Sequence, residues 1–324
     1  MNTVELEAHQ FAIGTVVHEQ REFPALLLPQ RRVLDLGRVG CESVGALLGD
    51  WDPALAWLEA LAAAPPSGLL DLADLRISVP YVPTQILQSG ANYRTHVVDL
   101  AVDREIGRRP GMSIEELRAE AEAMMDARIS GGEPYVFLGA SSALAGPYDD
   151  IVLPAHGDHD WELELAVVIG RSGRHVPPQR ALEHVAGYTI CNDITTRDLV
   201  NRADMPAIGT DWLRAKNAPT FLPTGPWIIP AAFVGDPAKL QITLELNGET
   251  MQDAPTSDMM FTVTRLIAYL SDWIGLRAGD LLLTGSPAGN GSHYGRYLAP
   301  GDVVDGSITG LGTQRNQCVA EDAA

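Results

Sequence analysis

The sequence predicts an α+β protein that is mostly β, with a small N-terminal domain followed by a larger one. Three observations lead to this prediction. Short apolar runs separated by Gly and Pro recur along most of the chain, which is typical of strands joined by turns. Helical periodicity is confined to a few segments, which do not alternate with strands as in βαβ folds. The length of 324 residues is sufficient for one large and one small domain.

The first part of the chain has the pattern of a small α+β domain. Strand-like runs occur over residues 11–36, where FAIGTVV, PALLLP and RRVLDLG are broken by turns. A helix is predicted to begin at Asp52 as N-cap, with Pro53 at the first helical position. The Pro- and Gly-containing residues 64–68 end this helix. We therefore predict a small N-terminal domain over residues 1–80.

Residues 81–324 are predicted to form the larger, mostly β domain. One helix is predicted near 258–272, among many strand-like runs such as YVFLG, LELAVVIG and QITLELNG. A helical insert is predicted at about 100–133, because Ser113 and Glu116 there are spaced as a capping box. We expect this insert to form or brace a lid. No G-x-G-x-x-G or G-x-x-x-x-G-K motif occurs, which argues against a nucleotide-binding fold.

The composition excludes several classes of protein. The chain has 23 Lys and Arg against 42 Asp and Glu, a net charge of −19, which disfavours a nucleic-acid partner. It does not forbid an anionic substrate, since a bound dication reverses the local field. The three cysteines are far apart, as expected for free thiols in a reducing compartment. No signal peptide or membrane-spanning stretch stands out, so we expect a cytoplasmic protein without a membrane partner.

Glu162 and Glu164 are two residues apart in a run of strand character. A period of two places both carboxylates on one face of a strand, where like charges are unfavourable unless something compensates them. A third carboxylate, Asp193, ends the run GYTICND. A divalent cation is the natural compensation, and oxygen ligands suit Mg²⁺, Mn²⁺ or Ca²⁺ rather than Zn²⁺.

The alternative is that the two glutamates line a solvated strand face while Asp193 only caps a helix. The run AVVIG, which directly follows the pair, argues against an exposed strand. It is continuously apolar, as is typical of a strand buried on both faces. The spacing alone leaves the two interpretations about equally supported.

Long motifs in the larger domain occur in a characteristic order. They are GANYRTHVVD (90–99), WELELAVVIG (161–170), GYTICNDITTRD (187–198), LRAKNAPTFLPTGPW (213–227), LNGETMQ (246–252), LRAGDLLLTGSPAG (276–289) and LAPGDVVDGSITGLG (298–312). Over roughly residues 85–312 the chain thereby resembles the catalytic domain of the fumarylacetoacetate hydrolase family. The resemblance implies a mixed β-sandwich roll assembled as a homodimer. It also implies that Glu162, Glu164 and Asp193 hold Mg²⁺ or Mn²⁺, in agreement with the site expected from the residues.

The resemblance also implies catalytic roles for a histidine, an acid and a lysine. His96 and Asp99 form an H-x-x-D pair, which shares a face if this loop forms a helical turn. A carboxylate bonded to one imidazole nitrogen makes the other a better base, and family members use such a histidine, often with Glu, to activate water. Lys216 matches the family's active-site lysine and would stabilise an enolate or oxyanion. The alternatives are an ordinary loop histidine and a surface lysine.

Substrate-binding residues are predicted at Arg197, Ser286 and Tyr93. Ser286 takes the place of a threonine in the family's T-G-T-P turn and keeps a hydroxyl for a substrate carboxylate. Tyr93 lies in the GANYR segment shortly before the candidate histidine. Arg197 supports Asp193 or binds an anionic substrate, with a structural salt bridge as the alternative.

Three residues depart from the family's pattern near the expected substrate pocket. Gly139 stands in place of a lysine, Val200 in place of a glutamine and Asn217 in place of a serine. The substrate is therefore expected to differ from the commonest one of the family.

The leading functional hypothesis is metal-dependent hydrolysis of a carbon–carbon bond in a small anionic keto acid. The substrate would be a 1,3-diketo acid of acylpyruvate or fumarylacetoacetate type, chelated to the metal, which acts as a Lewis acid. One alternative is decarboxylation of a β-keto acid such as oxaloacetate, and another is isomerisation or hydration of an unsaturated keto acid. A third, from another class, is a non-catalytic metal-stabilised binding protein.

Overall fold

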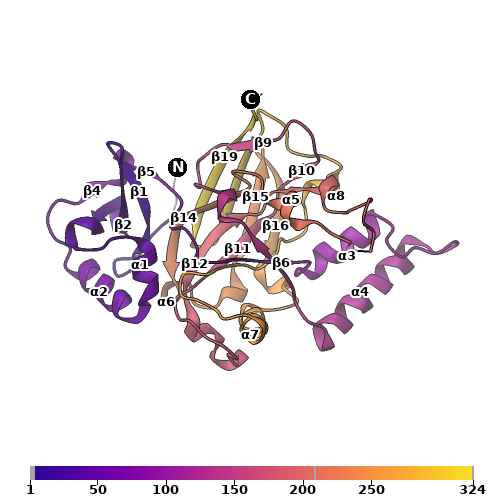
Figure 1. The fold of residues 1–324 in the computed structure, drawn as a ribbon, viewed down its shortest axis with the longest axis horizontal. Helices are drawn as coiled ribbons and strands as arrows, with labels where there is room; N and C mark the ends of the chain where they lie inside the picture. The colour runs from indigo at the N-terminus through magenta and orange to yellow at the C-terminus, as the bar shows by residue number, and fades with distance from the viewer. Residues whose placement is uncertain (1–3, 208, 323–324) are drawn as a thin grey trace.

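The computed structural model describes residues 4–207 and 209–322. Strands and helices are mixed and sheets dominate (Figure 1), which confirms the predicted fold class. The strand-like runs of residues 11–36 form strands, as predicted. The N-terminal elements are β1 (Ala12–His18), β2 (Arg21–Leu28), β3 (Arg32–Asp35), α1 (Val44–Gly49), α2 (Trp51–Ala63), β4 (Leu70–Asp71) and β5 (Arg76–Ile77).

Helix α2 begins two residues earlier than the sequence predicts. Its first residue is Trp51 and its N-cap is Asp50, so the prediction of Asp52 as N-cap is wrong. Pro53 is tolerated within the first turn, because the first N–H groups of a helix have no intrahelical carbonyl partner. The helix ends at Ala63, directly before the Pro-containing segment, as predicted.

The larger sheet has 12 strands and runs from the N-terminal strands into the rest of the chain. Beyond β1 it continues through β14 (Leu222–Pro230), β12 (Val185–Asn192), β11 (Leu163–Ile169), β17 (Leu281–Leu283), β6 (Ile86–Gly90) and β7 (Tyr135–Gly139). Strands β1 and β14 meet where Ile13 faces Ile228. Strands β11 and β12 are antiparallel and buried throughout. The domain boundary near residue 80 stays a prediction.

A second sheet of five strands shares the core with the first. Its order is β16 (Glu249–Pro255), β15 (Gln241–Leu246), β18 (Val303–Ile308), β19 (Gly312–Ala320) and β9 (Ile151–Leu153). Leu163 and Val167 of β11 belong to the core cluster that contains residues of β15 and β18. Ala166 and Val168 belong to the cluster that contains residues of α1 and α2. Strand β11 is therefore buried on both faces, as the run AVVIG predicts.

The insert predicted at about 100–133 contains the end of α3 (Arg94–Asp103) and all of α4 (Ile114–Gly131), and the two helices form a hairpin at the right of Figure 1. Ser113 caps α4 and forms the predicted capping box with Glu116. The reciprocal bonds satisfy N–H groups that the first turn of a helix leaves without a partner. Helix formation over this segment is therefore encoded locally.

Helix α7 (Val263–Trp273) contacts the hairpin at the C-terminal end of α4. Its Arg265 donates to the carbonyls of Ile129 and Gly132, at 2.7 and 3.2 Å. The short elements are β8 (Leu144–Ala145), β10 (His159–Asp160), β13 (Thr195–Thr196), α5 (Trp212–Lys216), α6 (Ala231–Val234) and α8 (Gly291–Tyr294). In the part of the chain that the structure describes, no helix has the length and apolar character needed to cross a membrane.

Candidate metal centre

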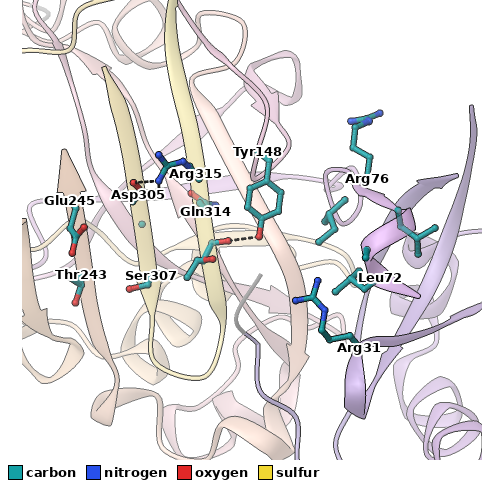
Figure 2. A pocket seen from close by; sticks show the side chains of 15 residues that line it. Arg31, Leu72, Arg76, Tyr148, Thr243, Glu245, Asp305, Ser307, Gln314 and Arg315 are labelled. Carbon is teal, nitrogen blue, oxygen red and sulfur yellow. Dashed lines mark hydrogen bonds and ion pairs between the residues drawn. The ribbon is translucent and has the colours of Figure 1, made fainter. Parts of the chain in front are cut away.

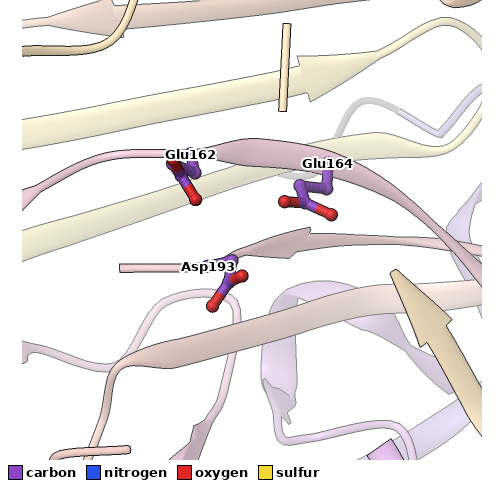
Figure 3. A group of neighbouring side chains, drawn as sticks. All are labelled: Glu162, Glu164 and Asp193. Atoms are coloured by element: carbon purple, nitrogen blue, oxygen red, sulfur yellow. The ribbon is translucent and has the colours of Figure 1, made fainter. Parts of the chain in front are cut away.

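Glu162, Glu164 and Asp193 come together at the ends of the two central strands (Figure 3). Each is buried, and each contributes a carboxylate oxygen such that these atoms all lie within 4.8 Å of one another. The antiparallel register brings them together, because Leu163 pairs with Asn192 and the next residues along, Glu162 and Asp193, lie opposite each other. The N–H of Asp193 donates to the carbonyl of Glu162 at 2.8 Å and continues that pairing.

Lys216 lies between two of the three carboxylates. Its Nζ is 2.6 Å from Oε2 of Glu162 and 2.6 Å from Oδ2 of Asp193, and its side chain is buried. Burial disfavours its charged form, but Asp193 and Glu162 outweigh burial and raise the pKa of Lys216 above its usual value. The structure therefore brings this lysine to the acidic cluster rather than to the surface.

Arg197 contacts Glu162 rather than Asp193. Its Nε donates to Oδ2 of Asp160 at 2.6 Å, and its Nη2 donates to Oε1 of Glu162 at 2.5 Å. Asp160 also accepts from the backbone N–H groups of Gly291 and Ser292. Arg197 is thus held in a buried ion-pair network beside the cluster, which is the structural alternative that the sequence left open.

The three carboxylates differ in how their charge is compensated. Burial alone would raise the pKa of Glu162, but Arg197 and Lys216 outweigh burial and hold that pKa well below its usual range. Burial raises the pKa of Glu164 well above its usual range, and repulsion from Asp193 adds to the effect. Burial also raises the pKa of Asp193 to about 6, although Lys216 opposes it. Glu164 is therefore the carboxylate whose negative charge is least compensated by nearby groups.

The charge balance fits a divalent cation. Four buried carboxylates, those of Asp160 and the three clustered residues, face the two cations Arg197 and Lys216, which leaves two formal negative charges. Uncompensated buried charges are costly, and oxygen donors are the ligands that hard dications prefer. The only protein hydrogen bond to Glu164's carboxylate among the described residues comes from the N–H of Gly285, at 2.6 Å. The acidic cluster could therefore bind a divalent metal ion.

His96 and Asp99 both lie on α3, one turn apart. His96 is buried, and burial lowers its pKa below the usual value, although the charge of Glu162 opposes this effect. Asp99 forms an ion pair with Arg118 of α4, with Oδ1 and Nη1 at 3.0 Å. Among the described residues, no hydrogen bond or ion pair joins His96 to Asp99. The helical turn that this pair requires is present, and the pairing itself stays a prediction.

The predicted substrate-binding residues Ser286 and Tyr93 are both buried. Oγ of Ser286 accepts from Nε2 of Gln252 at 3.0 Å, while Oε1 of Gln252 accepts from the N–H of Leu163 at 3.0 Å. Gln252 therefore links the turn that contains Ser286 to Leu163, the residue between the two glutamates. Tyr93 is fully buried, and burial raises its pKa well above the usual value, with the charge of Glu164 adding to this.

Sequence reasoning missed Gln252 and a second buried amide, Gln88. Nε2 of Gln88 donates to Oδ1 of Asp193 at 2.7 Å. Neither strand gives a local signal for its amide, because each amide has a polar as well as an apolar neighbour. Buried polar groups of this kind need hydrogen-bond partners, so they mark places where a strand contacts another polar group.

The departures from the family pattern have local explanations at two positions. Asn217 accepts from the N–H of Ala140 at 2.5 Å and donates to the carbonyls of Trp212 and Leu213, so it ties the end of α5 to the segment after β7. Gly139 lies directly against the side chain of Gln88. Nothing in the structure explains Val200.

A cavity of about 770 Å³ lies elsewhere, between the N-terminal region and the second sheet (Figure 2). Its lining includes Arg31, Leu72 and Arg76 on one side and Asp305 and Arg315 on the other. None of the predicted site residues is among the described residues that line it. The cavity and the acidic cluster are therefore separate features.

The fold and the site together define a class of sheet-rich proteins in which buried carboxylates gather at the ends of two central antiparallel strands. The model of the fumarylacetoacetate (FAA) hydrolase C-terminal family matches residues 85–319. The chain belongs to this family. The resemblance inferred from the sequence motifs is thereby confirmed.

Individual relatives share the family but differ in activity. The chain is 44% identical over 189 residues to a 2,4-didehydro-3-deoxy-L-rhamnonate hydrolase of Sphingomonas sp. (strain SKA58), covering 57% of this chain and 65% of that protein. It is 40% identical over 190 residues to oxaloacetate tautomerase FAHD2B, mitochondrial, of Homo sapiens, covering 58% of this chain and 59% of that protein. The chain thus spans less than two thirds of the length of these curated relatives. It is 28% identical to the solved fumarylacetoacetate hydrolase of psychrophilic Exiguobacterium antarcticum, with a TM-score of 0.73, covering 96% of this chain and 100% of that chain.

Proposed function

We propose that this protein is a divalent-metal-dependent hydrolase that cleaves a carbon–carbon bond in a 1,3-diketo acid. The observation that carries the proposal is the buried carboxylate cluster with two uncompensated negative charges, next to Lys216. Mg²⁺ or Mn²⁺ is the proposed cofactor, and Ca²⁺ is the alternative, because all three prefer oxygen ligands. A dication bound by Glu162, Glu164 and Asp193 would act as a Lewis acid on the oxygens of a chelated substrate.

The chain's own residues would move protons and stabilise charge. We assign His96 as the base, because its lowered pKa keeps the imidazole neutral near pH 7 and able to accept a proton from water. The hydroxide adds to the distal carbonyl, the carbon–carbon bond breaks, and its electron pair leaves on the enolate. The positive charge of Lys216 stabilises that enolate, and a proton from His96 then converts it to the keto acid. In this scheme Asp99 orients His96 when substrate is bound.

The printed name of the Sphingomonas relative supports a diketo-acid substrate. That protein is named a hydrolase of a 2,4-didehydro acid, and carbons 2 and 4 stand in the same 1,3 relation as the carbonyls of a 1,3-diketo acid. The substrate of this chain is proposed to be a small keto acid of that class. Its side chain is the part that the departures at Gly139 and Val200 would alter.

The human relative favours a second candidate, isomerisation or decarboxylation of a β-keto acid. That protein is named an oxaloacetate tautomerase, and its match to this chain is nearly as strong as that of the hydrolase. Tautomerisation needs a base to remove a proton, whereas decarboxylation forms the enolate by loss of CO₂ and needs a proton donor afterwards. His96 would move the proton in either reaction, and Lys216 would stabilise the enolate. The two candidates differ in whether water attacks a carbonyl.

Product analysis distinguishes these candidates. The protein is incubated with a short acylpyruvate and with oxaloacetate, each with Mn²⁺ and with EDTA. Metal-dependent release of pyruvate and a carboxylic acid from the acylpyruvate supports hydrolysis. Turnover of oxaloacetate alone supports the second candidate, and its products separate tautomerisation from decarboxylation. Turnover that persists in EDTA contradicts both proposals.

The role of His96 is tested in the same assay. We expect His96→Ala to lower kcat by a factor of roughly 100 or more, as is usual for loss of a general base. His175→Ala is the matched control, because His175 is exposed and pairs with Asp272 on the surface. Equal activity of the His96 variant and its control would remove His96 from the mechanism.

A further inference from the structure

Gln88 is a polar residue of β6 whose side chain is buried, beside the apolar Leu87 and the polar Ser89. It lies in β6 between β17 and β7, opposite Leu283 on one side and Phe137 on the other, and its side chain is completely inaccessible to solvent. An amide buried in this way is unfavourable unless it is hydrogen-bonded. The Gln88 amide therefore needs a hydrogen-bond partner.

That partner is the candidate metal ligand Asp193. Nε2 of Gln88 donates to Oδ1 of Asp193 at 2.7 Å, whereas Lys216 contacts the other oxygen, Oδ2, at 2.6 Å. The two donors hold the carboxylate from both sides and thereby fix its orientation. Residues that hydrogen-bond to a metal ligand typically set its geometry and its affinity for the metal.

Gly139 provides the space in which the Gln88 side chain lies. In the antiparallel pair of β6 and β7, Ile86 faces Gly139 and Gln88 faces Phe137, so Gly139 and Gln88 are diagonal neighbours on one face. A Cβ at position 139 would lie 2.6 Å from Oε1 of Gln88 and 2.9 Å from Cγ2 of Ile86. The backbone of Gly139 does not have a positive φ, so space rather than conformation requires glycine here.

The side-chain carbonyl of Gln88 also bears on how its amide is held. Among the described residues, its Oε1 has no hydrogen-bond partner. The buried amide is therefore satisfied only through its bond to Asp193, and any displacement of the side chain breaks that bond. A methyl group at position 139 would cause such a displacement, because the amide is the movable end of a flexible side chain.

We propose that Gln88 is a positioning residue that orients Asp193 for metal binding, and that Gly139 keeps the space for its amide. The inference rests on the proposed metal site but not on the proposed reaction. It concerns a pair of residues on neighbouring strands that act on the metal ligand together.

The test is a double-mutant cycle read out as the Kd for Mn²⁺, measured by titration of the metal-free protein. We expect Gln88→Met, which keeps the volume but loses the donor, to weaken binding about tenfold. Gly139→Ala should weaken binding by a similar factor of about ten in the wild-type background, and by less than about twofold in a Gln88→Ala background. Gly131→Ala is the control, since a Cβ there meets nothing within 4 Å.

Each outcome decides the proposal. A thermal unfolding transition in EDTA shows that each variant titrated is folded, and Gln88→Met supplies the result if the alanine variants do not fold. Wild-type Kd values for Gln88→Met and Gly139→Ala overturn the positioning role. Losses that multiply in the double variant overturn the pairing of Gln88 with Gly139. A wild-type protein that binds Mn²⁺ but cleaves no diketo acid refutes only the proposed reaction, whereas one that binds no Mn²⁺ overturns this inference as well.

Discussion

Glu162 directly precedes β11 and Glu164 lies within it, yet the charges of the two carboxylates are compensated to different extents. Glu162 is paired with Arg197 and Lys216, whereas the carboxylate of Glu164 accepts one backbone N–H. Removing a paired buried charge leaves its partners uncompensated, while removing an unpaired one relieves repulsion. The same chemical substitution should therefore have opposite effects at the two positions.

The first prediction concerns stability in EDTA. Glu162→Gln should lower the free energy of unfolding by about 3 kcal/mol, because it breaks a buried ion-pair network. Glu164→Gln should raise it by about 1 kcal/mol, because the amide keeps the shape and loses the repelled charge. Denaturant unfolding of both variants and the wild type measures the difference. Equal losses in both variants would contradict the assigned charge balance.

The second prediction concerns pH. Burial raises the pKa of Asp193 to about 6 and that of Glu164 well above its usual range, so both favour the folded state when they are protonated. That contribution to stability is lost as the pH rises through the folded-state pKa of each group. A bound dication compensates the ionised carboxylates at higher pH and so restores the lost stability. At low pH, protons compete with the metal for these carboxylates. The rise in Tm on adding Mn²⁺ should therefore be larger near pH 8 than near pH 5, as measured by thermal unfolding at both values. An equal rise at both values would show that the metal binds elsewhere.

At the scale of elements, the α3–α4 hairpin determines the surroundings of His96. Asp99 of α3 is paired with Arg118 of α4, and among the described residues no hydrogen bond joins its carboxylate to His96. The lid role of this insert stays a prediction.

The third prediction follows from this ion pair. Arg118→Met removes a cation next to Asp99, which leaves the carboxylate free to bond with His96 and to raise the pKa of that histidine. The acidic limb of the pH profile of kcat/KM should then move to higher pH. Arg109→Met, which removes an exposed ion pair with Glu120 on the same hairpin, is the control. An unchanged acidic limb would separate Asp99 from the titration of His96.

The central strands and the shared face of Glu162 and Glu164 were predictable, because their signals are local. The period of two at Glu162 and Glu164 and the apolar run that follows require only neighbouring residues. The capping box at Ser113 is local in the same sense. The partners of the carboxylates were not predictable, since Gln88 and Asp193 are 105 residues apart in sequence and β6 does not pair with β12, the strand that ends directly before Asp193. The family resemblance indicated that Lys216 belongs to the site, whereas its charge alone would have predicted a position on the surface.

At the scale of the whole molecule, the acidic cluster is buried and none of its residues lines the 770 Å³ cavity of Figure 2. Shape and charge therefore direct attention to two different features, the cavity and the carboxylates. The homodimer implied by the family resemblance stays a prediction, as does the cytoplasmic location.

The most direct test of the account is a crystal of the protein soaked with Mn²⁺ and measured for anomalous scattering of manganese. The account predicts one strong anomalous peak between the carboxylates of Glu162, Glu164 and Asp193, with oxygen ligands at roughly 2.0–2.3 Å. It also predicts that Gln88 keeps its hydrogen bond to Asp193 in the loaded protein. A peak at another place, or carboxylates that bind no manganese while the protein remains folded, would contradict the central claim.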